Sequence, residues 1–317
     1  MTKDNKSLKI ILAQPRGFCA GVERAIGIVN RAIEMFDEEI YVKHEVVHNK
    51  NVIEELTKKG VVFIESLTEV PDKSILIYSA HGVSKEVTDI AQKKNLRIFD
   101  ATCPLVTKVH FEIHKYARQN IDVILIGHNG HPEVEGTMGQ YKSNEGKIYL
   151  VESKADVETL EIKNKKISYV TQTTLSVDDT QDIVDALKEK YPNIEGPKKS
   201  DICYATQNRQ EAVKKILDLC DSLVVVGSQN SSNSQRLKEI AVQCGKDAYL
   251  IDHESQLDID KLSKSKVIGI TAGASAPEHT VQALIKFLIN NGAKMSNEEI
   301  IFKEEAVVFS LPKSLRQ

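Results

Sequence analysis

The sequence lacks the patterns that mark several common protein classes. Its 317 residues contain neither G-x-G-x-x-G nor G-x-x-x-x-G-K-[ST], so no nicotinamide or P-loop nucleotide signature is present. No run of about eighteen apolar residues predicts a transmembrane helix, and the polar N-terminus lacks the apolar core of a signal peptide. We therefore expect a cytosolic protein that does not associate with a membrane.

A marked net charge is also absent. Lysine and arginine number 42 against 45 aspartate and glutamate residues, which leaves a formal charge of −3. This balance gives no electrostatic footprint for nucleic acid or for an anionic membrane surface. Neither is expected as a partner, and any anionic ligand must be held by local groups.

Cysteine is scarce. Five cysteines, an odd number, do not resemble a disulfide framework. In a reducing compartment they are expected to be ligands, nucleophiles or core residues. No C-x-x-C pair is present, which argues against a structural zinc knuckle and against a bacterial ferredoxin motif.

What the chain does contain is an alternation of short apolar runs and amphipathic segments, with 41% hydrophobic residues overall. Residues 8–13 predict a buried strand, and a helix follows from just after Cys19 to about Phe36. Cys19 then lies near a helix N-terminus, where unpaired N–H groups and the macrodipole favour a thiolate. This position suits a metal ligand or a nucleophile, and a buried structural cysteine is the alternative.

The alternation continues through most of the chain. Strands are expected at 40–47, 61–64, 75–78, 96–99, 123–126, 167–170, 223–226 and 267–270. Helices lie between many of these strands, and Pro104 suits the first position of a helix capped by Cys103. The loop 191–200 marks a boundary, and in the tail the apolar piece 306–309 could add a strand.

Three cysteines recur at matching places in this alternation, namely Cys19, Cys103 and Cys203. A first polar turn follows them after 29, 28 and 28 residues, at His48, His131 and Ser231 respectively. A second follows after 62, 70 and 72 residues, at His81, Thr173 and Ser275. Repetition of a supersecondary unit at fixed spacing is a signal of the fold.

We predict an α/β protein made of three units with small parallel sheets, related by a pseudo-threefold axis. The expected boundaries are 1–102 for the first unit, 103–200 for the second, 201–291 for the third and 292–317 for a C-terminal tail. In such sheets ligand groups gather where strands end and helices begin. A threefold axis would bring the three cysteines and the polar turns to one central cavity.

Three thiolates, one from each unit, describe a metal site better than a disulfide or a catalytic thiol. Zinc with three cysteines is one option. A cubane iron–sulfur cluster is the sharper one, because three protein thiolates leave one iron open to bind and polarise a substrate oxygen. The other two cysteines, Cys220 and Cys244, lie late in amphipathic helices and are expected to be core or inert surface residues.

The polar turns carry donors that suit an oxyanion such as phosphate or diphosphate. These donors are His48, His81, His131, Thr173, Ser231, Ser232, Asn233 and Ser275. The remaining histidines are expected to be structural or exposed. His110 and His114, four residues apart, are expected on a solvated helix face, because Phe111 stands where a zinc helix of the H-E-x-x-H type needs glutamate.

A carboxylate able to carry a proton follows His131. Glu133 in the Pro-Glu-Val-Glu-Gly turn is the first candidate for a general acid, with Glu135 as its competitor. Since the chain has no nicotinamide signature, electrons should arrive from a partner protein.

Nine blocks of the sequence, taken in order, resemble the 4-hydroxy-3-methylbut-2-enyl diphosphate reductase family of the methylerythritol phosphate route to isoprenoids. They are PRGFCAGVERA, EVVHN, SAHGVS, DATCPLVTKVH, GHNGHPEVEGTMGQ, TQTTLSVDDT, DICYATQNRQ, GSQNSSNSQRL and TAGASAP, within about residues 8 to 312. The resemblance implies a trefoil of three α/β domains around a 4Fe-4S cluster held by Cys19, Cys103 and Cys203.

The resemblance also implies the roles of the other site residues. A substrate diphosphate would be bound by His48, His81, His131, Ser231, Ser232, Asn233 and Ser275. Thr173 and Glu133 would lie near the substrate hydroxyl group, with Glu133 supplying protons. The implied reaction is a two-electron, two-proton reductive dehydroxylation to isopentenyl and dimethylallyl diphosphate, with electrons from a flavodoxin- or ferredoxin-type donor.

A different class of protein competes with this interpretation. A cluster- or zinc-carrying electron-transfer or metal-sensing protein would also use three converging cysteines. That hypothesis gives the hydroxyl and histidine donors no role. The chain lacks the long N-terminal extension of plastid enzymes, so the resemblance is to a bacterial, cytosolic form.

Overall fold

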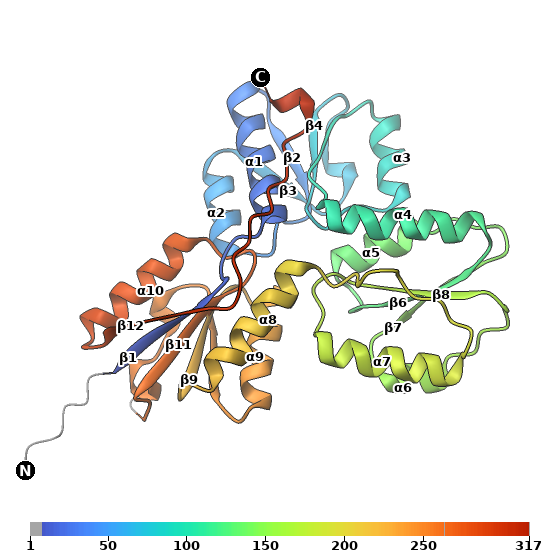
Figure 1. Cartoon of the computed structure of the whole chain (residues 1–317). Coiled ribbons are helices and arrows are strands. Elements are labelled where there is room, and N and C mark those ends of the chain that lie inside the picture. Colours follow the sequence, from blue (N-terminus) through green and yellow to red (C-terminus); the bar gives the residue numbers. More distant parts are fainter. Residues whose placement is uncertain (1–7, 263, 317) are drawn as a thin grey trace, which may run out of the picture. The chain divides into compact units, whose positions relative to one another are not determined.

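The strands of the described residues form three sheets in which every pairing is parallel (Figure 1). The computed structural model describes residues 8–262 and 264–316. The prediction of an α/β protein with small parallel sheets is confirmed. No helix in these residues is long and apolar enough to cross a bilayer.

The chain divides into two compact units. The five-stranded unit contains residues up to 20, 48–54 and 204–308, and the two-sheet unit contains the rest of the chain. Two helices, α1 (Ala20–Met35) and α2 (Lys50–Lys58), have residues in both units. The predicted arrangement of three units around a common cavity, and its boundaries at 102, 200 and 291, stay predictions.

The five-stranded unit has the strand order β10-β9-β11-β1-β12. Its strands are β1 (Lys9–Gln14), β9 (Ser222–Val226), β10 (Asp247–Ile251), β11 (Val267–Ala272) and β12 (Lys294–Ile301). Its helices are α8 (Tyr204–Leu217), α9 (Ser232–Gln243) and α10 (Glu278–Asn290), with short 3-10 turns η2 (Glu254–Gln256) and η3 (Ile259–Leu262).

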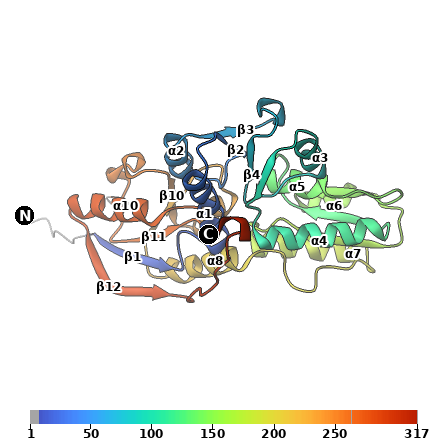
Figure 2. The ribbon, with the colours of Figure 1, turned by 90° about the horizontal axis from the view of Figure 1, so that it is seen from above.

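Both faces of this sheet are covered. Side chains of α10, such as Leu284, pack on Ile10 and Ile268, whereas α8 and α9 pack on Ile11 and Val225 from the opposite face. Figures 1 and 2 show α10 and α8 on opposite sides of the strands. Burial on both faces explains why these strands are continuous apolar runs in the sequence.

Two features of this sheet differ from the sequence-based expectations. Strand β1, expected to begin the first unit, pairs with β11 and β12, so the start and the end of the chain build one sheet. The tail does add a strand, but at β12 and not at 306–309. Apolar pattern identifies a strand, whereas its pairing partner is decided by tertiary packing.

The two-sheet unit contains a four-stranded sheet in the order β3-β2-β4-β5 and a three-stranded sheet in the order β7-β6-β8. The first comprises β2 (Ile40–Lys43), β3 (Val61–Ile64), β4 (Ile75–Tyr78) and β5 (Arg97–Asp100). The second comprises β6 (Asp122–Ile126), β7 (Ile148–Val151) and β8 (Ile167–Thr171). Strand β2 stops before the predicted residue 47, because His44 takes a left-handed φ of 60°.

Helices cover both faces of the three-stranded sheet. They are α4 (Pro104–Arg118), α5 (Pro132–Gly139), α6 (Lys154–Thr159) and α7 (Val177–Lys190). Val109 of α4 and Val134 of α5 pack on one face, and Leu187 of α7 packs on the other (Figure 1). The other elements of this unit are α3 (Lys85–Lys93), η1 (Leu67–Glu69) and η4 (Lys313–Leu315).

Because each sheet is parallel, the carboxyl ends of its strands lie along one edge, where the following helices start. The predicted site residues other than Cys203, which directly precedes α8, lie in the loops between a strand and the next helix or in the first turn of that helix. The predicted site residues of each sheet therefore lie at its carboxyl edge, which is where parallel sheets commonly bind ligands.

The core of the three-stranded sheet offers a test of packing. Leu187 is fully buried between α7 and the strands. Replacing it with alanine leaves a cavity, so Leu187→Ala should lower the free energy of unfolding by about 2 to 5 kcal/mol. Urea titration followed by circular dichroism measures this change, with the exposed neighbour Lys188→Ala as control. A loss below about 1 kcal/mol would contradict the packing described here.

Candidate active site

Each of the three recurring cysteines lies directly before a helix. Cys19 precedes α1, Cys103 is the N-cap of α4 with Pro104 at the first helical position, and Cys203 precedes α8. None of the three forms a disulfide, and all three are of intermediate exposure. A partly accessible thiol at a helix start is in a position that suits a metal ligand.

The remaining cysteines differ in kind. Cys220 is buried under the five-stranded sheet, where burial raises the pKa of its thiol to about 11, and Cys244 is exposed. A thiol with so high a pKa is a poor ligand and a poor nucleophile. Cys220 is therefore a core residue and Cys244 lies at the surface, which agrees with the positions predicted for them.

Six predicted residues of the two-sheet unit form a connected group, the Glu133 cluster: Cys103, His81, His131, Glu133, Thr173 and Cys203. The Cys103 N–H donates to the carbonyl oxygen of Ala80, the neighbour of His81, at 3.0 Å. The rings of His81 and His131 meet edge to face with 5.6 Å between their centroids. At the other end, the Cys203 N–H donates to the carbonyl oxygen of Thr173 at 2.9 Å.

Glu133 links the two ends of this cluster. Its N–H donates to Nδ1 of His131 at 3.1 Å, because His131 is the N-cap of α5. Its carboxylate accepts the Thr173 N–H at 2.6 Å and the Thr173 hydroxyl at 2.9 Å. The side chain is therefore held in one orientation by two donors from the same residue.

Burial determines the protonation of Glu133. Only 3% of the residue is exposed, and desolvation raises the pKa of its carboxyl to about 7, against the opposing effect of the two Thr173 hydrogen bonds. Its competitor Glu135 is exposed on the same helix. A carboxyl group that titrates near pH 7 is suited to giving and taking protons, which favours Glu133 as the acid.

The other predicted residues form a second group in the five-stranded unit, the Ser275 cluster: Cys19, His48, Ser231, Ser232, Asn233 and Ser275. The Cys19 N–H donates to the carbonyl oxygen of Ala274 at 3.1 Å. The Ser275 hydroxyl donates to the carbonyl oxygen of His48 at 2.8 Å. Ser231 is the N-cap of α9, and Asn233 lies in the first turn of that helix.

Asn233 indicates what the Ser275 cluster could bind. Its side chain is buried, yet neither its amide nitrogen nor its amide oxygen has a partner among the described residues. A buried amide without a partner costs free energy and is usually completed by a ligand or by water. Since N–H groups at a helix start attract anions, this position fits a phosphate group.

Two glycines allow α9 to approach the strand ends this closely. A Cβ atom on Gly227 would lie 2.2 Å from Oγ of Ser234, and one on Gly273 would lie 2.0 Å from the same atom. Any larger residue would push the first turn of α9 away from β9 and β11. The two glycines therefore hold the N-terminus of α9 at the edge of the sheet.

The three cysteines predicted to bind a metal belong to two different units of the chain. Cys19 belongs to the five-stranded unit, and Cys103 and Cys203 belong to the two-sheet unit. Over residues 8–262 and 264–316, no three His, Cys, Asp or Glu side chains form a group that could hold a metal. Binding of one metal centre by all three cysteines stays a prediction.

The expected solvated position of His110 is wrong. His110 is buried, and burial lowers the pKa of its imidazole to about 4, so the ring is neutral. Gly82 makes room for it, because a Cβ atom at Gly82 would lie 2.7 Å from Cε1 of His110. His114, one turn later, is half-buried.

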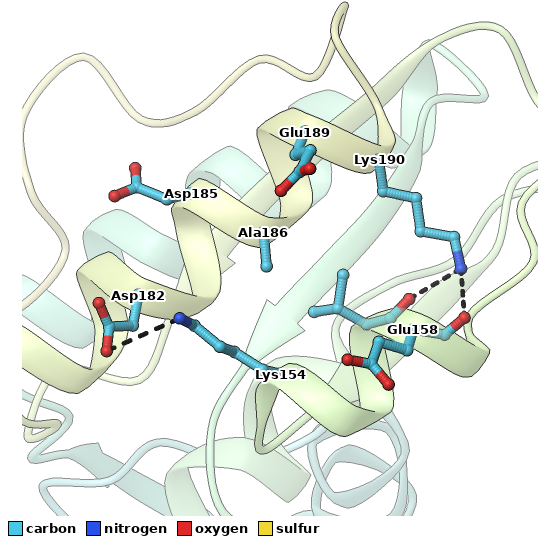
Figure 3. Close-up of a pocket in the computed structure, with 8 residues that line it drawn as sticks. Lys154, Glu158, Asp182, Asp185, Ala186, Glu189 and Lys190 are labelled. Carbon is cyan, nitrogen blue, oxygen red and sulfur yellow. Dashed lines mark hydrogen bonds and ion pairs between the residues drawn. The ribbon is translucent and has the colours of Figure 1, made fainter.

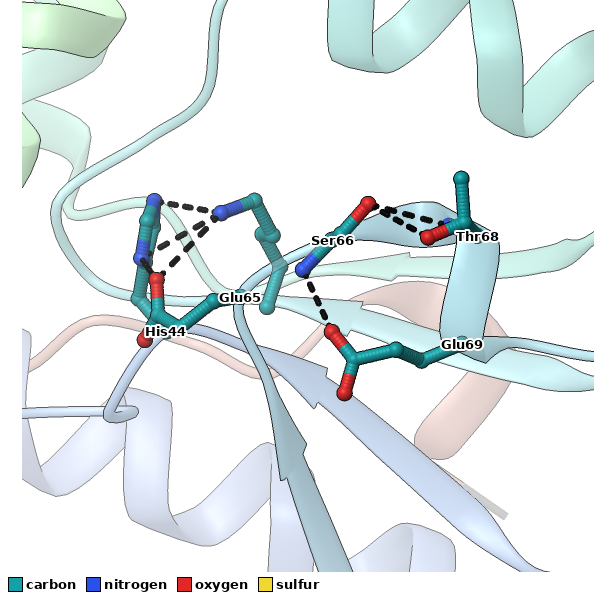
Figure 4. A network of polar contacts seen from close by, with 6 residues as sticks. His44, Glu65, Ser66, Thr68 and Glu69 are labelled. Atoms are coloured by element: carbon teal, nitrogen blue, oxygen red, sulfur yellow. Dashed lines mark hydrogen bonds and ion pairs between the residues drawn. The ribbon is translucent and has the colours of Figure 1, made fainter.

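His44 has a structural role, as expected. Figure 4 shows its ring beside Glu65, with Nδ1 2.6 Å from the Glu65 carboxylate. Nε2 of the ring lies 2.7 Å from the Lys43 ammonium. Burial and the adjacent Lys43 lower the pKa of the imidazole, so a neutral ring can accept from one neighbour and donate to the other. In the same view, Ser66 and Glu69 form the capping box of η1.

Sequence patterns assigned no role to Asp201 and Lys108. Asp201, two residues before Cys203, is buried, accepts the Thr171 N–H at 3.1 Å and pairs with the Lys108 ammonium at 2.9 Å. Desolvation raises the pKa of Asp201. The repeat could have pointed to Lys108, because a basic residue follows each of the three recurring cysteines after five or six residues.

A hollow of about 530 Å³ between α6 and α7 contains none of the predicted site residues (Figure 3). Its charged residues are Lys154, Glu158, Asp182, Asp185, Glu189 and Lys190. The Lys190 ammonium donates to the carbonyl oxygens of Val157 and Glu158, at 2.9 and 2.7 Å. With more carboxylates than ammonium groups, this hollow would repel an anion.

Parallel sheets with thiols at helix starts and a buried carboxyl group whose pKa is raised to about 7 fit the class of α/β enzymes with acid–base chemistry. Residues 10–289 match the family described as LytB protein. The chain belongs to this family, which is that of 4-hydroxy-3-methylbut-2-enyl diphosphate reductase, and it is an oxidoreductase.

Relatives match over nearly the whole chain. The 4-hydroxy-3-methylbut-2-enyl diphosphate reductase of Acinetobacter baumannii is 58% identical over 311 residues, 98% of each chain. The enzyme of the same name from Methylococcus capsulatus is also 58% identical, over 98% of this chain and 99% of its own.

Solved structures of such reductases agree. The E-1-hydroxy-2-methyl-but-2-enyl-4-diphosphate reductase of Plasmodium falciparum has a TM-score of 0.92 and 43% identity, covering 98% of this chain and 97% of its own. A second structure, described as the terminal enzyme of the non-mevalonate pathway, has a TM-score of 0.65 and 30% identity, covering 90% and 99%.

The raised pKa of Glu133 predicts a pH dependence of stability. The folded protein holds this proton more tightly than the unfolded chain, whose glutamate has the ordinary pKa of 4.5. The stabilisation is complete below pH 4.5 and is lost as the pH rises through about 7, a loss of about 3 kcal/mol. Glu133→Gln, which mimics the protonated acid, should remove this dependence in urea titrations between pH 4 and pH 8.

Glu135→Gln is the matched control, because Glu135 is exposed on the same helix and its replacement should leave the wild-type pH profile unchanged. If wild type and Glu133→Gln lose stability in parallel as the pH rises, Glu133 does not titrate near pH 7.

Proposed function

We propose that this chain reduces 4-hydroxy-3-methylbut-2-enyl diphosphate to isopentenyl and dimethylallyl diphosphate. Two electrons and two protons are consumed, the C–O bond at the allylic carbon breaks, and the hydroxyl group leaves as water. Family membership and 58% identity over 98% of the chain support this substrate. The observation that carries the proposal is the buried Glu133–Thr173 pair beside Cys203.

The proposed cofactor is a 4Fe-4S cluster bound by the thiolates of Cys19, Cys103 and Cys203. The residues fit such a group, because all three are half-buried and directly precede or cap a helix, whereas Cys220 is buried and Cys244 is exposed. When bound, a cluster with three protein ligands would supply the electrons and one open iron that polarises the substrate hydroxyl group.

The substrate diphosphate is proposed to bind to hydrogen-bond donors from the two residue groups named above, the Glu133 cluster and the Ser275 cluster. These donors are His48, His81, His131, Ser231, Ser232, Asn233 and Ser275. The unpartnered amide of Asn233 and the helix start at Ser231 support an anion there. A net charge of −3 supplies no general attraction, so these local donors must provide the affinity.

Proton delivery is assigned to Glu133. With a pKa of about 7, its carboxyl is protonated in a large share of molecules at neutral pH and can release that proton to the leaving hydroxyl group. The Thr173 hydroxyl, 2.9 Å from this carboxyl, is placed to orient the substrate hydroxyl and to relay the proton. The Thr173 N–H stabilises the carboxylate that remains.

Electrons are proposed to come from a flavodoxin- or ferredoxin-type protein. The chain has neither G-x-G-x-x-G nor G-x-x-x-x-G-K-[ST], and the lack of a nicotinamide signature favours a protein as the donor. A small one-electron carrier delivers electrons singly, which suits a cluster.

Metal content tests the cofactor. Protein purified without oxygen should be brown, absorb near 400 nm, a region typical of iron–sulfur clusters, and contain close to four iron and four sulfide per chain. Each of Cys19→Ser, Cys103→Ser and Cys203→Ser should lose the cluster and the turnover of the hydroxylated diphosphate with dithionite and a viologen dye. Cys244→Ser, at an exposed thiol, is the control and should keep both.

A colourless protein that contains zinc and shows no turnover would refute the reductase mechanism and support a metal carrier or sensor. A protein with a cluster but without turnover would point to electron transfer alone.

Replacement of the acid tests proton delivery. Glu133→Gln keeps the acceptor for the Thr173 N–H but cannot donate an acidic proton, so kcat should fall by about 10²- to 10⁴-fold. Cluster absorbance and substrate Kd should stay near the wild-type values, and Glu135→Gln should retain full turnover. Equal losses in the two variants would exclude a special role for Glu133.

A further inference from the structure

A basic side chain follows each of the three proposed cluster ligands at nearly the same distance. Arg24 lies five residues after Cys19 on α1, Lys108 lies five after Cys103 on α4, and Arg209 lies six after Cys203 on α8. None of them belongs to the proposed catalytic or substrate-binding residues. Each contacts the chain just before a different cysteine.

Arg209 holds the loop that leads to Cys19. It is fully buried, and its guanidinium donates to the carbonyl oxygen of Gly17 at 2.7 and 3.2 Å and to that of Phe18 at 3.4 Å. Its third nitrogen atom, Nη1, donates to the carbonyl oxygen of Ala205 in α8 and pairs with the carboxylate of Glu305 at 3.2 Å. All of these residues belong to the five-stranded unit.

Arg24 holds the loop that leads to Cys103. Its guanidinium donates to the carbonyl oxygens of Thr102 at 3.0 Å and Asp100 at 3.2 Å, one and three residues before the cysteine. It also donates to the carbonyl oxygen of Ser310 at 3.1 Å. These partners all lie in the two-sheet unit.

Lys108 holds the loop that leads to Cys203. Its ammonium donates to the carbonyl oxygen of Lys199 at 3.1 Å and to the carboxylate of Asp201 at 2.9 Å. Asp201 in turn accepts the N–H of Thr171, so the loop is tied to the end of β8. This group also lies within the two-sheet unit.

The three contacts form a closed cycle along the chain. The helix after Cys19 holds the loop before Cys103, the helix after Cys103 holds the loop before Cys203, and the helix after Cys203 holds the loop before Cys19. We infer that Arg24, Lys108 and Arg209 are positioning residues that fix the three cysteine loops for cluster binding. This inference rests on the proposed function, because it takes these cysteines as the cluster ligands.

A cation is suited to this task for two reasons. Hydrogen bonds from a charged donor are stronger than neutral ones, and a guanidinium presents several donors in a fixed plane, so one side chain can hold two carbonyl groups. Two of the three cations also hold the C-terminal segment, through Glu305 and Ser310. The segment after β12 therefore secures the clamps on Cys19 and Cys103.

Amide hydrogen exchange of the metal-free protein tests the clamps without the cluster. The N–H groups of Cys19, Cys103 and Cys203 each donate to a backbone carbonyl, so each should exchange slowly. Arg209→Gln should speed exchange at Cys19 alone by about tenfold or more, Arg24→Gln at Cys103 alone, and Lys108→Gln at Cys203 alone. Arg209→Lys, which keeps the buried charge, replaces Arg209→Gln if that variant does not fold.

Cluster retention gives the second measurement. In reconstituted protein each neutral variant should lose iron to a chelator about tenfold faster than the wild type, with an altered electron paramagnetic resonance spectrum of the reduced cluster. Lys108→Arg, which can still donate to Asp201, should restore the wild-type rate.

Matched controls replace an exposed charged residue on each of the same helices, namely Glu34→Gln on α1, Lys115→Gln on α4 and Lys215→Gln on α8. These should behave as wild type in both measurements. Unchanged exchange at the three cysteines, equal changes at all three in every variant, or the same effects in the controls would overturn the inference. If the wild type binds no cluster, the proposed function fails, whereas the exchange experiment still decides whether the cations hold the loops.

Discussion

The parallel direction of every strand pair is the constraint from which the site follows. Parallel strands end at the same edge of a sheet, so the loops that leave them and the helices that begin there share that edge. Cys19, Cys103 and Cys203 each precede a helix for this reason, and His131 and Ser231 are helix N-caps. A helix start offers N–H groups and a partial positive charge, which favour thiolates and oxyanions alike. The same backbone arrangement thus suits both a thiolate of the protein and a bound oxyanion.

Two opposing effects act on Glu133, and their balance matters for chemistry. Desolvation favours the neutral acid, whereas the two donors of Thr173 favour the carboxylate. Either effect alone would move the pKa away from neutrality, upward without Thr173 and downward in water. Together they give a pKa of about 7, so the acid and its conjugate base are both accessible under physiological conditions. The geometry that orients the carboxyl group therefore also sets its proton affinity.

The sequence predicted the fold class, because strands buried on both faces are apolar runs and the repeat of cysteines and polar turns shows that units recur. It did not predict that β1 pairs with β11 and β12, because a short apolar segment carries no information on which strand it will pair with. The burial of His110 depends on the missing Cβ of Gly82, a residue distant in sequence. Among the proposed site residues, those in turns were predicted from their spacing along the sequence. Asp201 and the three clamping cations were missed, because they act on neighbours and carry no ligand chemistry of their own.

The pairing of β1 with β11 has a consequence for biosynthesis. Lys9 lies opposite Val267, and the loop before Cys19 also needs Arg209 and Glu305. While the chain emerges from the ribosome, the N-terminal strand must wait for nearly the whole polypeptide, roughly 15 to 60 seconds at about 5 to 20 residues per second. The two-sheet unit can fold during that interval, because all of its residues except 309–317 are synthesised before β11. The loop that carries Cys19 can therefore reach its final position only when translation is nearly complete, and a chain truncated before β11 leaves Cys19 without its anchoring loop.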